Sequence, residues 1–279
     1  MPIMVWLPLL LLLLPGPPAP PDIPDPAPLG IIDFYGLRSL SEAQARQALQ
    51  IKVGDTVSDF PAAAQHRLEA LPGVAQARFE LVCCDSGKSI LYVGIGEKGA
   101  PTPRFDPAPK GKVRLPAAVV QAGGAYEKAL FAAVAKGSVL QDMSQGHALD
   151  ADPASRAVEE NFVALAARYP KQLRDVLHHS ADAPQRALAA QVLAYAADKQ
   201  AVVAYFTAGM RDPDSGVRNN SMRALWVMAA SGRRIHVPVE PFIAMLSSLD
   251  WTDRNKASLA LQSLTATRDP AILSQLRNQ

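Results

Sequence analysis

Side chains that could do chemistry are scarce in this chain of 279 residues. The five histidines are His66, His147, His178, His179 and His236. No two of them are four residues apart, which is the spacing that places two metal ligands on one helix face. With only two cysteines, the chain cannot form a four-cysteine zinc site. We therefore expect no metal site, no cofactor and no catalytic residue.

One histidine offers an alternative to that expectation. His147 lies in an irregular stretch, close to Asp142, and loops carry function more often than cores do. The chain contains no Gly-x-Ser-x-Gly elbow, no phosphate-binding loop and no dinucleotide fingerprint. We therefore expect the protein not to be an enzyme, and an enzyme that uses the loop around His147 stays the alternative.

Cys83 and Cys84 are adjacent at the end of a predicted strand, which points their side chains to opposite faces. One interpretation is a buried thiol beside a partly exposed one. The other is a redox pair, such as a strained vicinal disulfide, in an oxidising compartment. Both interpretations stay open.

The amino terminus, residues 1–29, resembles a secretion signal followed by a spacer. Residues 3–14 are almost all apolar, and as a helix they would span about 18 Å, short of the roughly 30 Å core of a bilayer. Eight prolines follow between residues 15 and 28, and they predict an extended segment. We expect export to the periplasm or the extracellular space. An uncleaved amino-terminal anchor is the alternative, and this segment alone would then contact the membrane.

Residues 30–99 predict a small α+β domain. Its expected elements are a strand, two helices and two strands, at residues 31–35, 42–50, 58–71, 75–83 and 89–97. Ser41 and Gln44 form a capping-box signature before the first helix. In the last strand, alternate positions place Leu91, Val93 and Ile95 on one face. The expected order is β-α-α-β-β.

This order and three sequence segments resemble the POTRA (polypeptide-transport-associated) domain. The segments are "IIDFYGLRSLSEAQARQALQIKVGDTV", "LEALPGVAQARFELV" and "ILYVGI". The matching features are Gly36 after the first strand, the turn at 53–55 and the Leu-Pro-Gly-Val run at 71–74. The resemblance implies a protein-docking module of the bacterial cell envelope that binds by strand addition at an exposed sheet edge.

Residues 100–116 are rich in proline and basic residues, and they predict an interdomain linker. Residues 117–279 predict an all-α domain, because they are rich in alanine and poor in aromatic residues. Within this domain a unit repeats, with copies beginning at Asp182, Asp214 and Asp250 at offsets of 32 and 36 residues. Repetition at the length of a helix pair predicts a solenoid.

From about residue 155, and most clearly in "RDPDSGVRNNSMRALWVMAA", the chain resembles HEAT repeats. In such repeats the aspartate caps the second helix, and the arginine lies beside the acid of the next repeat. The resemblance therefore implies structural roles for Asp182, Arg186, Asp214 and Asp250, and it favours a structural role over ligand binding for Arg218 and Arg254 as well. It also implies a surface that binds a partner, with the candidate residues Arg218, Asn219, Asn220, Arg223, Arg254, Asn255 and Lys256.

The overall charge limits the choice of partner. Lysine and arginine total 28 and aspartate and glutamate 26, so the net charge is only +2. Residues 100–279 carry 21 basic and 16 acidic side chains, but no dense basic stripe, so we expect no nucleic acid. The expected function is an exported, non-enzymatic scaffold for protein–protein interactions in the bacterial cell envelope. The alternatives are a HEAT-like protein that binds nucleic acid and a lyase-type HEAT enzyme that uses the loop around His147.

Overall fold

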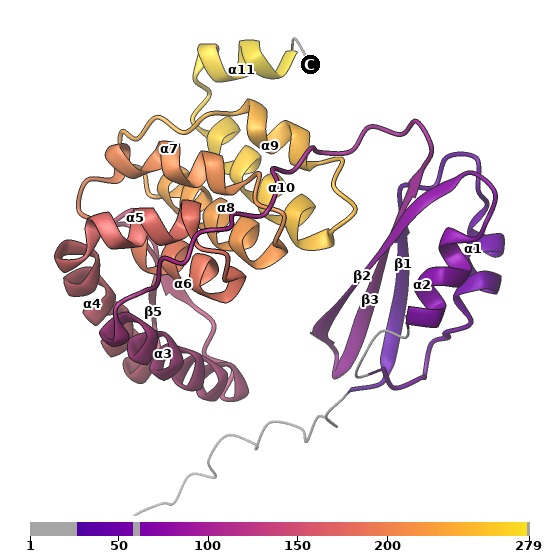
Figure 1. The fold of residues 1–279 in the computed structure, drawn as a ribbon, viewed down its shortest axis with the longest axis horizontal. Helices are drawn as coiled ribbons and strands as arrows, with labels where there is room; N and C mark the ends of the chain where they lie inside the picture. The colour runs from indigo at the N-terminus through magenta and orange to yellow at the C-terminus, as the bar shows by residue number, and fades with distance from the viewer. Residues whose placement is uncertain (1–26, 58–61, 278–279) are drawn as a thin grey trace, which may run out of the picture.

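The chain folds into an amino-terminal α+β domain followed by a helical region (Figure 1). The computed structural model describes residues 27–57 and 62–277, without the side chains of residues 83–85. The predicted apolar leader and nearly all of the spacer therefore lie outside the described residues. Two separate hydrophobic clusters, one within residues 29–95 and one within residues 115–264, form the two cores.

The α+β domain has the predicted order of elements. Its strands are β1 (Leu29–Tyr35), β2 (Val74–Asp85) and β3 (Lys88–Glu97), and its helices are α1 (Glu42–Leu49) and α2 (Ala62–Glu69). The sheet order is β1-β3-β2, with β1 parallel and β2 antiparallel to the central β3. The predicted capping box at Ser41 and Gln44 is confirmed. Helices α1 and α2 lie on the side of the sheet away from the helical region (Figure 1).

Alternation along β3 gives each face of the sheet a different partner. Leu91, Val93 and Ile95 are completely buried in the domain core, as their spacing predicts. Tyr92 and Gly94 lie on the opposite face, and that face is covered by the helical region. The Tyr92 ring stacks on Trp251 with ring centroids 4.6 Å apart.

Polar contacts hold this second face of the sheet in place. The Tyr35 hydroxyl donates to the Leu246 carbonyl at 2.7 Å. The Thr252 amide donates to the Glu80 carboxylate at 2.9 Å, and the Thr252 hydroxyl donates to the same group. The α+β domain is therefore docked on the helical region through its sheet.

The helical region contains nine helices and one short ribbon within the described part of the chain. The helices are α3 (Ala117–Ala135), α4 (Pro153–Arg168), α5 (Pro170–His179), α6 (Ala183–Leu193), α7 (Lys199–Gly209), α8 (Ser215–Ala230), α9 (Glu240–Met245), α10 (Trp251–Ala266) and α11 (Pro270–Arg277). The ribbon pairs β4 (Gln141–Asp142) with β5 (Leu149–Asp150). This ribbon corrects the prediction of an all-α domain. It lies in the stretch around His147, for which the sequence predicts irregular structure.

Aspartates begin several of these helices. Asp152, Asp182, Asp198 and Asp214 each accept a hydrogen bond from an amide of the first turn, which satisfies a donor that the helix leaves unpaired. Asp250 has the N-cap position of α10 but makes no capping bond. Its carboxylate instead accepts from Arg218, which corrects the capping role that the resemblance implied for it.

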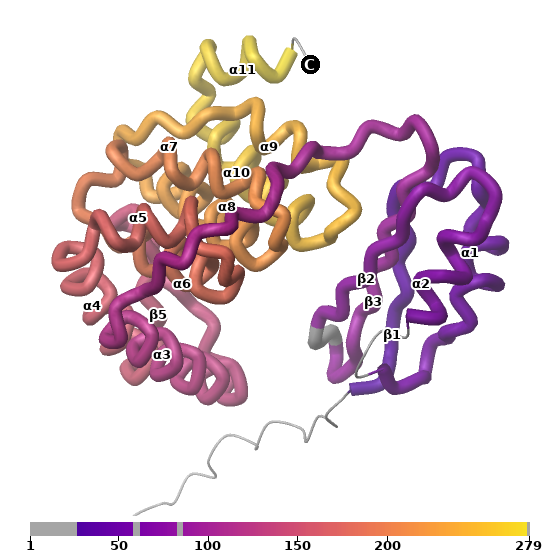
Figure 2. The backbone as a smooth tube through the Cα atoms, viewed as in Figure 1, coloured from indigo at the N-terminus to yellow at the C-terminus, as the bar shows by residue number. Residues whose placement is uncertain are grey.

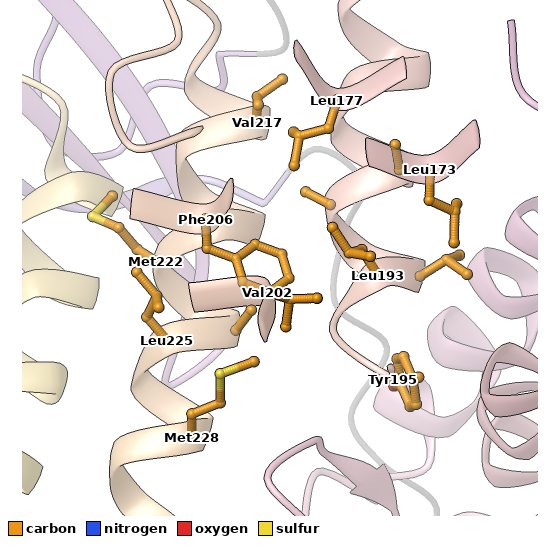
Figure 3. Packing of buried hydrophobic residues seen from close by; sticks show 14 of the residues in the cluster. Leu173, Leu177, Leu193, Tyr195, Val202, Phe206, Val217, Met222, Leu225 and Met228 are labelled. Carbon is orange, nitrogen blue, oxygen red and sulfur yellow. The ribbon is translucent and has the colours of Figure 1, made fainter. Parts of the chain in front are cut away.

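The helices stack in successive layers. Helix α8 packs between α6 and α10, while α5 packs on α6, α7 on α8 and α9 on α10; Figure 2 shows the course of the backbone through these layers. Leu177, Phe206 and Leu225 project from three of the helices into one core (Figure 3). All three side chains are almost fully buried.

Residues 100–116 connect the two parts as an extended strap that crosses the helical region (Figure 1). Asp106 bonds Arg211 through both its amide and its carboxylate. Farther along, the Ala181 amide donates to the Gly111 carbonyl at 2.8 Å. The segment that the sequence predicts to be a linker is docked on the helical region along its length. No helix in the described part of the chain is long and apolar enough to cross a bilayer.

Candidate binding groove

A groove of about 560 Å³ opens between α3, α6 and α8. Its size falls within the range of sites that bind small molecules and short peptide segments. The groove is lined by Gly123, Gly124, Tyr126, Glu127, Leu130, Gln141, His147, Ala148, Pro184, Ala187, Leu188, Gln191, Ala194, Tyr195, Asn219, Asn220, Arg223, Ala224 and Val227. The lining is therefore mixed, with aliphatic side chains beside about as many polar ones.

A pair of glycines lets α3 form one wall of this groove. A side chain at Gly123 would place its Cβ 2.7 Å from Leu188 of α6, so glycine permits the close approach of the two helices. At Gly124 a Cβ would meet nothing within 4 Å, because this residue borders the open groove. The packing of α3 on α6 therefore gives a structural reason for glycine at position 123.

Three of the predicted partner-binding residues meet in the groove. Asn219, Asn220 and Arg223 all lie on α8 and line one wall. The Asn220 side-chain amide donates to the Ala187 carbonyl at 2.9 Å, which ties this wall to α6. The polar residues that follow Arg218, in the repeat that begins at Asp214, therefore lie together on one wall of the groove.

Arg218 does not belong to this surface, which corrects its assignment as a partner-binding residue. Its side chain is 1% exposed, and its Nε lies 2.9 Å from Asp253 Oδ2. Its Nη2 donates to Asp250. The guanidinium group also lies over the ring of Phe105 in the strap. Arg218 therefore links the repeats internally, because a buried guanidinium needs carboxylate partners.

The third group of predicted residues lies away from the groove. The Arg254 guanidinium lies 3.8 Å from the centroid of the Tyr35 ring, so it faces the α+β domain of the same chain. Burial lowers the pKa of Lys256, and the neighbouring Arg223 lowers it further. Asn255, which lies between Arg254 and Lys256 in the sequence, is half-buried. These three residues do not line the groove.

Beneath the groove lies a buried carboxylate, capped by two tyrosines of the lining. Glu159 on α4 is fully buried. It accepts hydrogen bonds from the hydroxyls of Tyr195 at 2.9 Å and Tyr126 at 3.4 Å, and from the Asp150 amide. Burial raises the pKa of Glu159 to about 6. Burial and the charge of Glu159 raise the pKa of both tyrosines, which keeps their hydroxyl groups protonated as donors.

Arg223 is held by the side-chain amide of Gln141, which in turn bonds Asp150 beneath the groove. Its Nη2 donates to Gln141 Oε1 at 2.9 Å, and Gln141 Nε2 donates to Asp150 at 2.6 Å. Within the described residues, Arg223 has no carboxylate at ion-pair distance. The guanidinium is therefore oriented by a neutral side chain, and its remaining N–H groups are available to a ligand.

His147 lines the groove beside a buried lysine. Lys199 Nζ donates to His147 Nδ1 at 3.0 Å and to the Ala194 carbonyl at 2.8 Å. Burial and the charge of Lys199 lower the pKa of His147 to about 4, and burial lowers the pKa of Lys199 to about 8. At neutral pH the imidazole is therefore neutral and accepts at Nδ1, so its proton is on Nε2.

This tautomer decides what His147 can do. A neutral imidazole whose Nδ1 is occupied by an ammonium group has no free lone pair with which to take up a proton. Its Nε2–H can donate a hydrogen bond. The geometry therefore suits His147 to binding and does not suit it to general-base catalysis.

Reasoning from the sequence missed the residues of the groove floor. Glu159 was detectable, because it lies on the buried face of α4 in phase with Ser155, Phe162 and Ala166, where a carboxylate is unexpected. Tyr126 and Tyr195 carry no such signal. They meet Glu159 only because α3, α4 and the end of α6 pack together.

Three of the four predicted structural residues have local structural roles, and Asp250, which makes no capping bond, is the exception. Asp182 and Asp214 cap their helices, and Arg186 pairs with Asp212. The side chains of Cys83 and Cys84 lie outside the described residues, so the candidate redox pair stays a prediction. In the part of the chain that the structure describes, no three His, Cys, Asp or Glu side chains are grouped to hold a metal ion.

Comparison with known proteins identifies no family for this chain. No family model matches the chain, and no curated protein matches it.

Proposed function

We propose that this protein is an exported, non-enzymatic scaffold for protein–protein interactions in the bacterial cell envelope, and that its helical region is a HEAT-like solenoid that binds a partner segment. The observation that carries the proposal is the groove between α3, α6 and α8, in which aliphatic side chains lie beside a polar wall that contains Asn219, Asn220 and Arg223. A pocket of this composition is typical of a binding site.

The stacking of the helices supports the solenoid. Helices α6, α8 and α10 lie side by side, and each begins one residue after an aspartate. Arg186 reaches forward to Asp212 and Arg218 reaches forward to Asp253. An arginine–aspartate contact thus links successive units, although the aspartate lies before the N-cap of α8 in one contact and within α10 in the other.

The α+β domain supports a second binding surface. The face of the sheet without helices is occupied by the helical region, through Tyr92 and Trp251 among others. Strand β2 is at one end of the sheet order, and among the described residues no strand pairs with its outer edge. Strand addition at β2 is therefore the way in which a POTRA-like domain would engage a peptide here.

Two observations favour binding of protein over the alternative functions. The Nδ1 atom of His147 accepts from Lys199, which argues against a base in this loop. Arg218 and Arg254, which a nucleic acid would need on the surface, are engaged with Asp253 and Tyr35 of the same chain.

Capture of partners from the native host tests the proposal. Tagged wild-type protein is cross-linked in intact cells, and the chains that co-purify are identified by mass spectrometry. We compare it with Gly124→Trp, which fills the groove from open space, and with Ala125→Trp, which adds the same side chain at an exposed position next to it. We expect wild type and Ala125→Trp to retain an envelope protein that Gly124→Trp loses.

Two results would contradict the proposal. If Gly124→Trp captured the partner as well as wild type does, the groove would not take part in the interaction. Recovery of the mature protein from the cytoplasm alone, in fractionated cells, would contradict export. Circular dichroism of both variants shows whether each remains folded, so that a loss of capture reports on the groove.

A further inference from the structure

The polar groups of the groove are unequal in their remaining hydrogen-bonding capacity. The carboxylates beneath the groove already have partners: Glu159 accepts from Tyr195 and the Asp150 amide, Asp150 accepts from Gln141, and the Tyr126 hydroxyl, 3.4 Å from an oxygen of each, has one proton to share between them. Carboxylates that accept this many bonds have little capacity left for a ligand. The floor therefore offers few acceptors to the groove.

Donors, in contrast, remain free. Arg223 spends one N–H on Gln141 and keeps its others, and it has no ion-pair partner in the described part of the chain. His147, with Nδ1 occupied by Lys199, carries its proton on Nε2 and lines the same groove. A ligand that binds here must supply acceptor atoms, because unpaired buried donors are costly.

A guanidinium group held in a fixed orientation selects among acceptors. Its parallel N–H bonds match the two oxygens of a carboxylate, and such charge-assisted pairs are the stronger ones. Glu159 and Asp150 balance the charge of Arg223 from beneath but stay outside ion-pair distance. Glu127 of α3, the acidic residue among those that line the groove, is exposed.

The rest of the lining requires an apolar portion beside that carboxylate. Leu130 of α3, Leu188 of α6 and Val227 of α8 contribute aliphatic surface from three sides. Burial of aliphatic groups there stabilises a bound segment, because it removes apolar surface from water. A small inorganic anion would leave these walls exposed.

We infer that the groove binds a peptide segment in which a carboxylate, paired with Arg223 and His147, stands next to aliphatic side chains. The inference rests on the proposed function only in that the ligand is a peptide. The carboxylate belongs to a chain end or to an acidic side chain, and both present the same two oxygens.

Calorimetric titration of the full chain with four peptides tests this inference. Acetyl-Ala-Leu-Leu with a free carboxylate is compared with its carboxamide, and acetyl-Leu-Glu-Leu-amide is compared with acetyl-Leu-Gln-Leu-amide. We expect at least one acidic peptide to bind tenfold or more tightly than its neutral counterpart. The pair that shows the difference identifies the source of the carboxylate.

Two variants assign the effect to the groove. In Arg223→Gln the preference for the acidic peptide should fall to about onefold, and in Arg223→Lys, which keeps the charge but loses the fork, it should be intermediate. Arg168→Gln removes an exposed arginine of α4 outside the groove and should keep the full preference. Circular dichroism melting confirms that all three variants remain folded.

Several outcomes would overturn the inference. If acidic and neutral peptides bound equally, the ligand would not need a carboxylate. Loss of partner capture in Gly124→Trp would then still support the groove as a binding site. If the preference for the acidic peptide survived in Arg223→Gln, a cationic group other than Arg223 would be responsible for it. Absence of binding by all four peptides would also reject the stated ligand class.

Discussion

The guanidinium group of Arg186 forms two parallel hydrogen bonds with the carboxylate of Asp212. Arg186 Nε lies 2.7 Å from Oδ2, and Nη2 lies 2.8 Å from Oδ1. Both side chains are less than 10% exposed, although they are 26 residues apart in sequence. The pair joins the start of α6 to the turn before α8, so it connects one helix layer to the next.

Removal of one member of this pair should destabilise the protein strongly. In Arg186→Met the Asp212 carboxylate is left buried without its partner, and such a loss costs about 3–5 kcal/mol. Urea unfolding followed by circular dichroism measures the change. Arg168→Met, at an exposed position of α4, should cost less than about 0.5 kcal/mol.

A double variant separates the loss of the pair from the cost of the stranded charge. Arg186→Met combined with Asp212→Leu removes both charges, so most of the lost stability should return. If the double variant were as unstable as Arg186→Met, the buried charge would not be the cause.

Gly94 should be essential for docking of the sheet on the helical region. A Cβ at this position would lie 2.1 Å from the Leu249 carbonyl oxygen, so Gly94→Ala forces the two surfaces apart. We expect a larger radius of gyration in small-angle scattering and a lower melting temperature. The emission of Trp251, which stacks on Tyr92, should also change.

Gly124→Ala is the matched control for this substitution. It adds the same methyl group where nothing lies within 4 Å, inside helix α3, where alanine is favoured over glycine by about 0.5–1 kcal/mol. The control should keep the compact shape and gain slightly in stability. An unchanged radius of gyration in Gly94→Ala would contradict the docked arrangement.

The strap should detach when Gly111 is replaced. A Cβ at Gly111 would lie 2.2 Å from the His179 carbonyl oxygen, so Gly111→Ala should break the bond from the Ala181 amide to the Gly111 carbonyl. Trypsin should then cleave at the basic residues of the strap faster than in wild type. Val113→Ala, at a partly exposed position, should leave the rate near that of wild type, and equal rates for both variants would contradict a docked strap.

Glu159 should make stability depend on pH in an identifiable range. Its pKa is about 6 in the folded protein, against 4.5 for an unperturbed glutamate, so the folded state holds the proton more tightly. The resulting stabilisation is fully present below about pH 4.5 and is lost as the pH rises through about 6. The loss should be on the order of 1–2 kcal/mol.

Urea unfolding of wild type and two variants between pH 4.5 and 8 checks this dependence. Glu159→Gln removes the titrating group, so the corresponding decrease between pH 4.5 and 7 should disappear, whatever the constant cost of the substitution. Glu160→Gln, at the exposed neighbour on α4, should keep the decrease. Parallel pH profiles for wild type and Glu159→Gln would contradict the raised pKa.

The local structure of this chain was largely predictable from its sequence. The alternation of Leu91, Val93 and Ile95 predicted a strand with one buried face, and the capping signature at Ser41 predicted the start of α1. The aspartates at 182 and 214 likewise marked the starts of α6 and α8. These features are local, since apolar periodicity and capping involve residues only a few positions apart.

The partners across the fold were decided only by the tertiary structure. Arg218 and Arg223 are five residues apart on one helix, yet the first is buried between two aspartates and the second lines a groove. Their surroundings depend on which helices pack on each face of α8. No local pattern in the sequence contains that information.

The groove floor shows the same division most clearly. Tyr126, Glu159 and Tyr195 come from three segments and meet at hydrogen-bonding distance. Periodicity and capping, which involve only a few neighbouring residues, predict the helices of these segments, and Tyr195 lies in the turn after α6. Only the packing of those helices determined which side chains meet, because that depends on how distant surfaces fit together.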